Sequence, residues 1–219
     1  MNLKKHANRI GLFGGSFDPV HNAHVALAEV ALMQLQLDSV RWIPAGNPWQ
    51  KPNQLAPAEH RAAMVALAIA DEPRFVLDRC ELHRNGPSYT LDTVRELQLS
   101  QPDARWFLII GQDQFSSFHT WRGWQELLQR VTLAVAGRPG ASSDVNVQVQ
   151  ADAAITGHQP VALPMMDVSS TQIRSRIANG QDIADLVPAP VASYIARHSL
   201  YGGDLNQGHK QSQELNGHS

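Results

Sequence analysis

A short apolar run, residues 10–13, is followed by the glycine-rich segment Gly14 to His24 and then by a helical pattern. The order strand, glycine turn, helix constrains the path of the chain more tightly than any other segment. It places backbone N–H groups at the positive end of a helix, where anions bind. His21 and His24 are three residues apart, so both imidazoles lie on one face of that helix. The segment therefore predicts a site for a nucleotide phosphate.

The rest of the chain alternates between segments typical of strands and segments typical of helices. Strands are predicted over residues 9–13, 40–44, 74–82, 106–110, 132–136 and 160–163. Helices are predicted over residues 23–37, 57–70, 90–99, 124–130, 169–178 and 190–198, with Ser88 or Thr90 as the cap of the third. This alternation indicates an α/β fold, Rossmann-like and doubly wound, with a mainly parallel sheet and helices on both faces.

The chain has 219 residues, of which 43% are hydrophobic, enough for a substantial core. We expect a single domain over residues 1–201, whose last part, about 169–200, is helical. Residues 141–159 carry no firm strand or helix signal. Residues 202–219 are polar with almost nothing apolar, and they predict a disordered tail.

Charge and cysteine content exclude several classes of protein. The formal net charge of −2 provides no basic field for nucleic acid. The single cysteine, Cys80, cannot form a disulfide within the chain, which favours a reducing cytoplasm, and we expect it to be a buried structural thiol. No apolar run approaches the roughly 20 residues of a membrane span, and residues 1–9 lack the apolar stretch of a signal peptide. We therefore expect a cytoplasmic protein with no membrane or nucleic-acid partner.

Ligands of open parallel sheets bind at the carboxyl ends of the strands, so the loops that follow the predicted strands indicate the chemistry. These loops share glycines, cations and hydroxyls. They comprise residues 14–24, 44–52, 111–113, 137–140 and 168–174. Together they predict a phosphate and ribose site.

Residues 14–24 and 168–174 resemble the paired signatures of the nucleotidyltransferase superfamily with the His-x-Gly-His motif. Three further segments, residues 86–93, 109–113 and 120–121, are similar to those of bacterial nicotinate-nucleotide adenylyltransferases. The resemblance extends over about residues 9–201. It implies transfer of the adenylyl group of ATP to nicotinate mononucleotide, giving deamido-NAD and pyrophosphate, by direct in-line attack without a covalent enzyme intermediate. Mg²⁺ would be held mainly by the ATP phosphates, with no metal bound by protein side chains alone.

The same resemblance assigns roles to individual residues. His21, His24 and Arg174 would be catalytic, because they would stabilise charge on the transferring phosphoryl group. The residues that would bind ATP are Gly14, Gly15, Ser16, Phe17, Lys51, Gly111, Asp113, Arg138, Ser169, Ser170 and Thr171. The residues that would bind the mononucleotide are Ser88, Tyr89, Thr90, Trp121 and Arg122. Among these, Trp121 would stack on the pyridine ring, and Thr90 with backbone near Arg122 would hold the nicotinate carboxylate.

Several of these residues could have a structural role instead of the catalytic or binding role that the resemblance implies. The two histidines could cap a helix or form a zinc pair, although a zinc site needs more ligands than the two they supply. Ser169 and Asp113 could each be simple helix N-caps. Lys51 and Arg174 could be solvated surface residues.

Further residues of the predicted site could also have a structural role instead of binding a substrate. Gly14 and Gly15 could form a plain tight turn. Trp121 could belong to the core with the neighbouring aromatic residues Phe115, Phe118 and Trp124. We expect Asp18 to organise its loop rather than to transfer a proton, because a phosphate nucleophile is already deprotonated.

Two positions depart from the family pattern. Ala23 stands where the family usually has glycine, and Gln50 stands where a histidine commonly precedes the loop lysine. Other functions also stay open: an adenylyltransferase for nicotinamide mononucleotide or pantetheine phosphate, and a non-catalytic module that senses a nucleotide. Retention of His21, His24, Lys51 and Arg174 favours an enzyme over a sensor. Neither rates nor oligomeric state follow from the sequence.

Overall fold

The computed structural model describes residues 7–47, 55–137, 158–162 and 166–202. Within this part of the chain, six strands form one sheet in the order β3-β2-β1-β4-β5-β6. The strands are β1 (Arg9–Gly15), β2 (Ser39–Pro44), β3 (Phe75–Leu77), β4 (Arg105–Ile110), β5 (Thr132–Gly137) and β6 (Gln159–Ala162). Every neighbouring pair is parallel. This order reverses between β1 and β4 and is that of the Rossmann fold, so the predicted fold class is confirmed.

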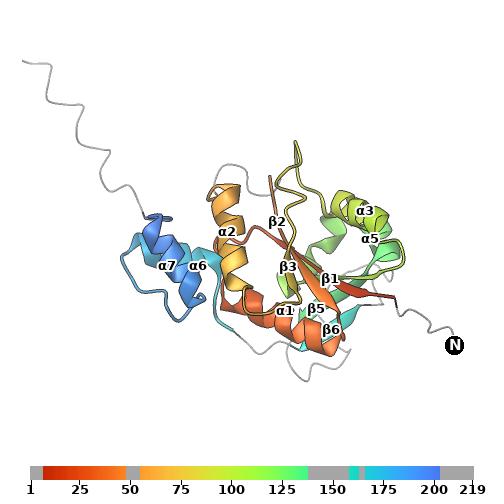
Figure 1. Ribbon diagram of the computed structural model, residues 1–219, viewed down its shortest axis with the longest axis horizontal. Helices are drawn as coiled ribbons and strands as arrows, with labels where there is room; N and C mark the ends of the chain where they lie inside the picture. Colours follow the sequence, from red (N-terminus) through yellow and green to blue (C-terminus); the bar gives the residue numbers. More distant parts are fainter. Residues whose placement is uncertain (1–6, 48–54, 138–157, 163–165, 203–219) are drawn as a thin grey trace, which may run out of the picture.

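Helices cover both faces of the sheet (Figure 1). They are α1 (Asn22–Gln34), α2 (Ala58–Ala68), α3 (Thr90–Ser100), α4 (Gln112–Ser116), the 3-10 turn η1 (Phe118–Thr120), α5 (Trp124–Arg130), α6 (Ser170–Ala178) and α7 (Ala189–Arg197). In Figure 1, α2, α6 and α7 gather on one side of the molecule, and α3 and α5 lie on the other.

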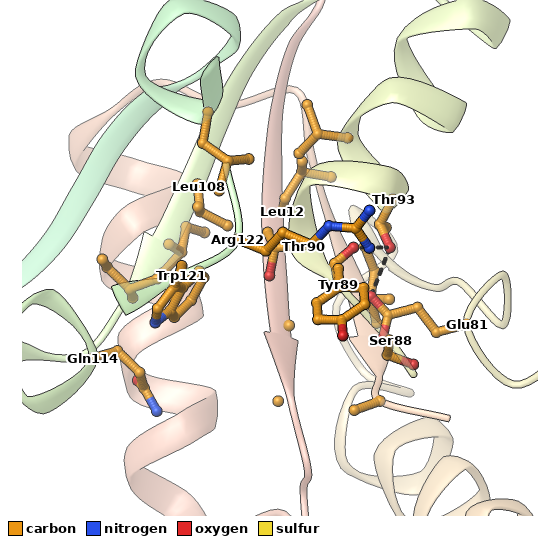
Figure 2. A pocket seen from close by; sticks show the side chains of 18 of the residues that line it. Leu12, Glu81, Ser88, Tyr89, Thr90, Thr93, Leu108, Gln114, Trp121 and Arg122 are labelled. Carbon is orange, nitrogen blue, oxygen red and sulfur yellow. Dashed lines mark hydrogen bonds between the residues drawn. The ribbon is translucent and has the colours of Figure 1, made fainter. Parts of the chain in front are cut away.

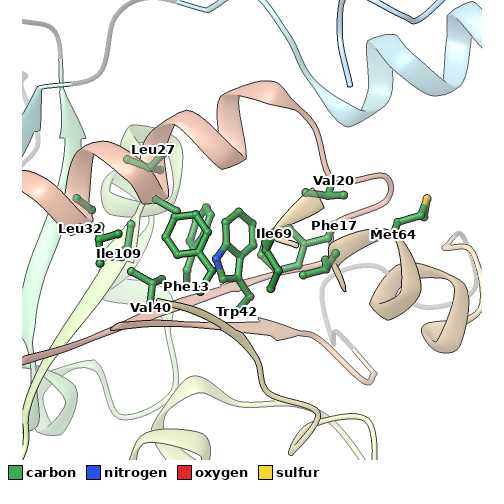
Figure 3. Close-up of a cluster of buried hydrophobic side chains, with 14 of the residues drawn as sticks. Phe13, Phe17, Val20, Leu27, Leu32, Val40, Trp42, Met64, Ile69 and Ile109 are labelled. Carbon is green, nitrogen blue, oxygen red and sulfur yellow. The ribbon is translucent and has the colours of Figure 1, made fainter. Parts of the chain in front are cut away.

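Residues of the four central strands, β1, β2, β4 and β5, enter two separate hydrophobic clusters, one on each face of the sheet. Phe13 of β1 and Trp42 of β2 lie in the larger cluster with residues of α1 and α2 (Figure 3). Buried residues of α6 and α7 belong to the same cluster. Leu12 of β1 and Leu108 of β4, which pair in the sheet, lie in the second cluster under α3, η1 and α5. Because both faces are covered, β1 and β4 carry no polar side chain after their first residue. The sheet is therefore a rigid support for the loops at its carboxyl edge.

The predicted strand over residues 74–82 was wrong beyond Leu77. The Asp78 carboxylate accepts a hydrogen bond from the Cys80 N–H at 3.0 Å, and the Leu82 N–H donates to the Arg79 carbonyl at 2.9 Å. The chain therefore turns after Leu77. Apolar residues recur in a turn of this kind without belonging to a sheet, so their alternation misled the prediction.

Two other predictions needed correction. The first helix ends at Gln34 rather than at residue 37, because Gln36 adopts a left-handed φ of 48° and the Leu37 N–H donates to the Leu32 carbonyl at 2.9 Å. The sequence also did not predict α4 and η1, which are too short to show helical periodicity.

None of the helices in the described ranges has the length and hydropathy required to cross a bilayer. The predicted tail beyond residue 202, and residues 141–157, lie outside the described residues.

Candidate active site

A cavity of about 240 Å³ opens where the strand order reverses, at the carboxyl ends of β1 and β4 (Figure 2). Leu12 and Leu108 from these two strands line it. The glycine loop contributes Gly14, Gly15 and Ser16 to the same cavity. All five predicted mononucleotide residues line it as well: Ser88, Tyr89, Thr90, Trp121 and Arg122. The fold thus brings part of the predicted ATP loop and the whole predicted acceptor set together.

One wall of the cavity is formed by Trp121 and Arg122. The Trp121 indole packs against Phe118, with ring centroids 5.3 Å apart, yet it also lines the cavity. Its indole nitrogen Nε1 is buried and has no hydrogen-bond partner among the described residues. The Arg122 guanidinium lies 4.6 Å from the centre of the Tyr89 ring and so reaches across to the opposite wall (Figure 2). Trp121 therefore belongs to the hydrophobic cluster and to the cavity at once.

The opposite wall is the segment that leads into α3. Neither Ser88 nor Thr90 caps this helix, which corrects the prediction; Tyr89 occupies the N-cap position without a side-chain cap bond. The Ser88 hydroxyl instead accepts a hydrogen bond from the Asn47 N–H at 3.3 Å, and the Ser88 N–H donates to the Asn47 carbonyl at 3.0 Å. This exchange ties the wall to the loop after β2, which explains why Ser88 is unavailable as a cap.

Glu81 is a buried carboxyl group on this wall that the sequence did not reveal. Its side chain is 8% exposed and accepts a hydrogen bond from the Thr93 hydroxyl at 2.7 Å. Burial raises the pKa of Glu81, while hydrogen bonds from Thr93 and Ser88 oppose the rise. The sequence predicted a strand here, whereas Glu81 lies in a turn. No pattern in the sequence indicated that this side chain is buried, so the structure alone identifies it.

The two histidines lie together at the start of α1. His21 is the N-cap residue, and its ring stacks on that of His24 with centroids 3.6 Å apart. The His21 N–H donates to His24 Nδ1 at 3.2 Å, so a neutral His24 carries its proton on Nε2 and can donate from that atom. His21 Nδ1 is buried and lacks a partner among the described residues. The capping alternative is therefore realised through His24 and leaves hydrogen-bonding capacity on both rings.

Burial keeps both imidazoles uncharged at neutral pH. It lowers the pKa of His21 to about 4, and burial together with the neighbouring His21 lowers the pKa of His24 well below 6.5. The rings of Phe13 and Phe17 lie 6.0 and 5.1 Å from that of His24, so an apolar surface borders this imidazole. In the free protein the pair therefore offers polar N–H groups rather than cations.

The loop between β1 and α1 is held by Asp18, as expected from its position. One carboxylate oxygen of this buried residue accepts hydrogen bonds from the Tyr201 hydroxyl at 2.8 Å and from the Ala56 N–H at 3.1 Å. Phe17 has a left-handed φ of 47° and its ring lies in the larger hydrophobic cluster, so only its backbone can face a nucleotide. Tyr201 was not identified from the sequence, because it lies 183 residues from its partner.

The start of α6 packs against the same loop. The Arg174 guanidinium donates to the Asp18 carbonyl at 2.7 Å and lies 3.7 Å from the Asp18 carboxylate. The Ser170 hydroxyl donates to the Pro19 carbonyl at 2.9 Å. Ser169 is the N-cap of α6 and accepts from the Gln172 N–H at 3.2 Å, while Thr171 lies on the exposed side and contacts Arg174. Arg174 is thus committed to the loop rather than solvated on the surface.

The remaining predicted residues lie at the edge of the site or outside the described chain. Gly111 is the N-cap of α4, so the alternative that Asp113 caps this helix was wrong; Asp113 is exposed in its first turn. Lys51 and Arg138 lie outside the described residues. Burial raises the pKa of the Cys80 thiol to about 12, which leaves no thiolate at neutral pH.

The described ranges contain no group of three or more histidine, cysteine or acidic side chains able to hold a metal ion. Asp18, which lies in the loop between β1 and α1, accepts hydrogen bonds from Tyr201 and Ala56 on one carboxylate oxygen, and its other oxygen lies 3.7 Å from the Arg174 guanidinium. The donor set of this part of the chain therefore does not form a metal centre by itself.

Comparisons with known proteins match this chain to a family and to proteins of known name. Residues 12–176 match the family model described as cytidylyltransferase-like. A protein of Methylibium petroleiphilum named probable nicotinate-nucleotide adenylyltransferase is 53% identical over 199 residues, which cover 88% of this chain and 92% of that protein. One of the same name from Bordetella petrii is 49% identical, covering 88% and 98%. The solved structure of Plasmodium falciparum nicotinic acid mononucleotide adenylyltransferase complexed with NaAD has a TM-score of 0.71 at 19% identity, covering 89% of this chain and 97% of that one.

Proposed function

Since this chain belongs to the cytidylyltransferase-like family, and within it to the nicotinate-nucleotide adenylyltransferases, we propose that it transfers the adenylyl group of ATP to nicotinate mononucleotide. The products are deamido-NAD and pyrophosphate, a step of NAD biosynthesis. The observation that carries the proposal is the cavity in which the glycine loop meets the acceptor wall. A neutral histidine pair lies at the start of the helix that follows this loop.

The reaction is a displacement at the α-phosphorus of ATP. A phosphate oxygen of the mononucleotide forms the new bond to this phosphorus. The bond between the α-phosphorus and its bridging oxygen to the β-phosphate breaks, and pyrophosphate leaves with the electron pair. The nucleophile is already ionised, so no protein base is required. Catalysis then depends on the alignment of the two substrates and on stabilisation of charge.

The ATP half of the site supplies that stabilisation. Neutral His21 and His24 donate N–H groups to phosphate oxygens, and Arg174 adds a fixed positive charge beside the loop. Gly14 and Gly15 let the backbone approach the phosphates. The start of α6, from Ser169 to Thr171, provides hydroxyl and N–H groups for the β- and γ-phosphates. These assignments rest on the positions of the side chains around one loop.

The acceptor half recognises the pyridine ring and its carboxylate. Trp121 stacks on the ring, and Thr90 with backbone near Arg122 holds the carboxylate. The cavity-lining positions of Trp121 and Thr90 support this assignment. The same groups set the preference for the acid over the amide.

We propose that Mg²⁺ is bound together with ATP, with phosphate oxygens of ATP as its ligands. When bound it supplies charge neutralisation at the phosphates, consistent with its preference for phosphate and water ligands. Lys51, Gly111, Asp113 and Arg138 remain predicted contacts of ATP. A cytoplasmic location and a single domain over residues 1–201 remain predictions, the first supported by the single cysteine.

An acceptor panel tests the proposed function. The purified protein is given ATP and Mg²⁺ with nicotinate mononucleotide, nicotinamide mononucleotide or pantetheine phosphate, and pyrophosphate release is measured. We expect the highest kcat/KM with nicotinate mononucleotide. A preference for pantetheine phosphate contradicts the proposal, and nucleotide binding without turnover of any acceptor favours the sensor alternative.

A further inference from the structure

A buried guanidinium on α2 joins loops from three parts of the chain. The Arg61 side chain is 1% exposed, and its donors all point to backbone carbonyls. Nε donates to the Ala56 carbonyl at 2.9 Å, and the two terminal nitrogens donate to the Ser16 carbonyl at 2.8 Å and the Ala45 carbonyl at 2.7 Å. This planar fork thus fixes three backbone segments relative to one another.

These three segments border the candidate site. Ser16 belongs to the glycine loop after β1, and Ala45 begins the loop after β2. Ala56 immediately precedes α2, and its N–H donates to the Asp18 carboxylate at 3.1 Å. Ala45 and Ala56 therefore flank the residues between β2 and α2 in the sequence, and Arg61 binds both flanks and the glycine loop.

The start of the loop after β2, which Arg61 holds at Ala45, also contacts the acceptor wall. A Cβ atom at Gly46 would lie 2.0 Å from the Glu81 carbonyl oxygen, so these two backbones are in close contact. Asn47 and Ser88 exchange the two hydrogen bonds described above. An unbroken series of contacts therefore runs from Ser16 through Arg61 and Ala45 to Ser88.

Stability alone is a weak reason for this arrangement. Removing a guanidinium from water costs several kcal/mol, and well-packed apolar side chains often replace buried ionic groups without loss of stability. A fixed spacing between the two substrates is a stronger reason, since a displacement of about 1 Å in a reacting pair can reduce the rate by about 100-fold.

We propose that Arg61 is a positioning residue that sets the separation between the glycine loop and the acceptor wall, and thereby aligns ATP with the mononucleotide. The inference rests on the proposed function, because it concerns the alignment of that function's two substrates. Arg61 acts through the backbone of Ser16 and Ala45 and is not among the residues that line the cavity.

The test is the variant Arg61→Lys, which keeps the charge but cannot reach three carbonyls with one planar fork. We expect kcat to fall about 10- to 100-fold in the folded variant, with each substrate's KM within about threefold of wild type, because alignment rather than binding is lost. Guanidinium ion at low, non-denaturing concentration should restore part of the kcat of Arg61→Ala.

Arg41→Lys is the matched control. Arg41 lies on β2 and pairs with Asp78 at 2.7 Å, outside the residues that line the cavity. Thermal unfolding of both variants separates loss of fold from loss of alignment. The proposal is overturned if folded Arg61→Lys has the same kcat as Arg41→Lys.

A second measurement on the wild-type protein covers the case in which Arg61→Lys and Arg61→Ala do not fold. Hydrogen exchange of residues 86–91 is followed after addition of a non-hydrolysable ATP analogue alone. We expect slower exchange there, because Arg61 joins the glycine loop to Ala45, and Asn47, two residues further on, is hydrogen-bonded to Ser88. Unchanged exchange with saturating analogue contradicts the proposal.

The acceptor panel is measured on the wild type first, which separates the two proposals. If another acceptor is preferred, the proposed function fails, and the Arg61 variants are assayed with that acceptor. If no acceptor is used, the proposed function fails, and the exchange measurement decides the inference about Arg61 alone.

Discussion

The two halves of the candidate site differ in how they are built: hydrogen bonds hold the loop of the ATP half, whereas the acceptor half lines most of a cavity. In the ATP half, hydrogen bonds of 2.7 to 3.1 Å join Asp18 to Tyr201 and Ala56, and join Arg174 and Ser170 to carbonyls of the loop. The acceptor half contributes its five predicted residues to the cavity of about 240 Å³, which the glycine loop closes on one side.

This difference matches the chemistry of the two substrates. A triphosphate is bound through many charges, so its loop benefits from being held in place before ATP arrives. A pyridine ring is bound by shape and stacking, which require an apolar cavity with a few polar groups. Substitutions in the first half should therefore reduce turnover, whereas substitutions in the second should weaken acceptor binding.

The largest effect is expected at His24. The variant His24→Ala should fold and lose at least about 100-fold in kcat, because it removes a donor to the charge that develops on the phosphoryl group. Steady-state kinetics measure the loss. The control is His198→Ala, because His198 is an exposed histidine outside the site. Near-normal turnover of His24→Ala contradicts the catalytic role.

The neutral histidine pair should make stability fall as the solution is acidified. The pKa of His21 is about 4 in the folded protein and about 6.5 unfolded, so the unfolded state binds the proton first. The stabilisation is complete above pH 6.5 and is lost between pH 6.5 and 4, at up to about 1.4 kcal/mol per pH unit. Urea unfolding across this range should show a smaller slope for His21→Asn, and equal slopes contradict the lowered pKa.

Trp121 tests whether the acceptor half acts separately. The variant Trp121→Ala should raise the KM for nicotinate mononucleotide about tenfold and leave the KM for ATP nearly unchanged, since stacking and apolar contact are lost on one side only. Trp124 packs in the same cluster without lining the cavity, so Trp124→Ala controls for the loss of core packing. Equal effects of the two variants would assign Trp121 to the core alone.

The smallest effect is expected at Tyr201, whose hydroxyl donates to Asp18. Tyr201→Phe should lower the free energy of unfolding by about 1 kcal/mol, because Asp18 loses one of its hydrogen bonds. The kcat/KM for ATP should fall a few-fold through the loosened loop. Tyr194→Phe, which loses a contact to His60 beside α7, is the control; its kcat/KM for ATP should not change.

The sequence predicted what depends on local patterns. The parallel sheet followed from the alternation of strands and helices, and the family motifs predicted the glycine loop and the five acceptor residues that line the cavity. The strand over residues 74–82 failed because the alternation of apolar residues also occurs in the turn around Cys80 and Glu81. Caps were also mispredicted at α3, where Ser88 bonds to Asn47 instead.

Contacts between distant residues were beyond local patterns. Arg61 reaches Ser16 across 45 positions, and Tyr201 reaches Asp18 across 183. Burial of Glu81 and Arg61 depends on how the loops pack, and a charged residue in a lone sequence is expected at the surface. The residues that hold the site together were therefore harder to predict than those that line it.

In the proposed reaction, the two halves of the site bring ATP and nicotinate mononucleotide together for one direct transfer. The most direct test follows a label on the α-phosphate of ATP through a single turnover. We predict that the label appears in deamido-NAD in equal amount to the pyrophosphate released, with none bound to the protein. Label retained on the protein, or released as AMP without dinucleotide, would contradict the account.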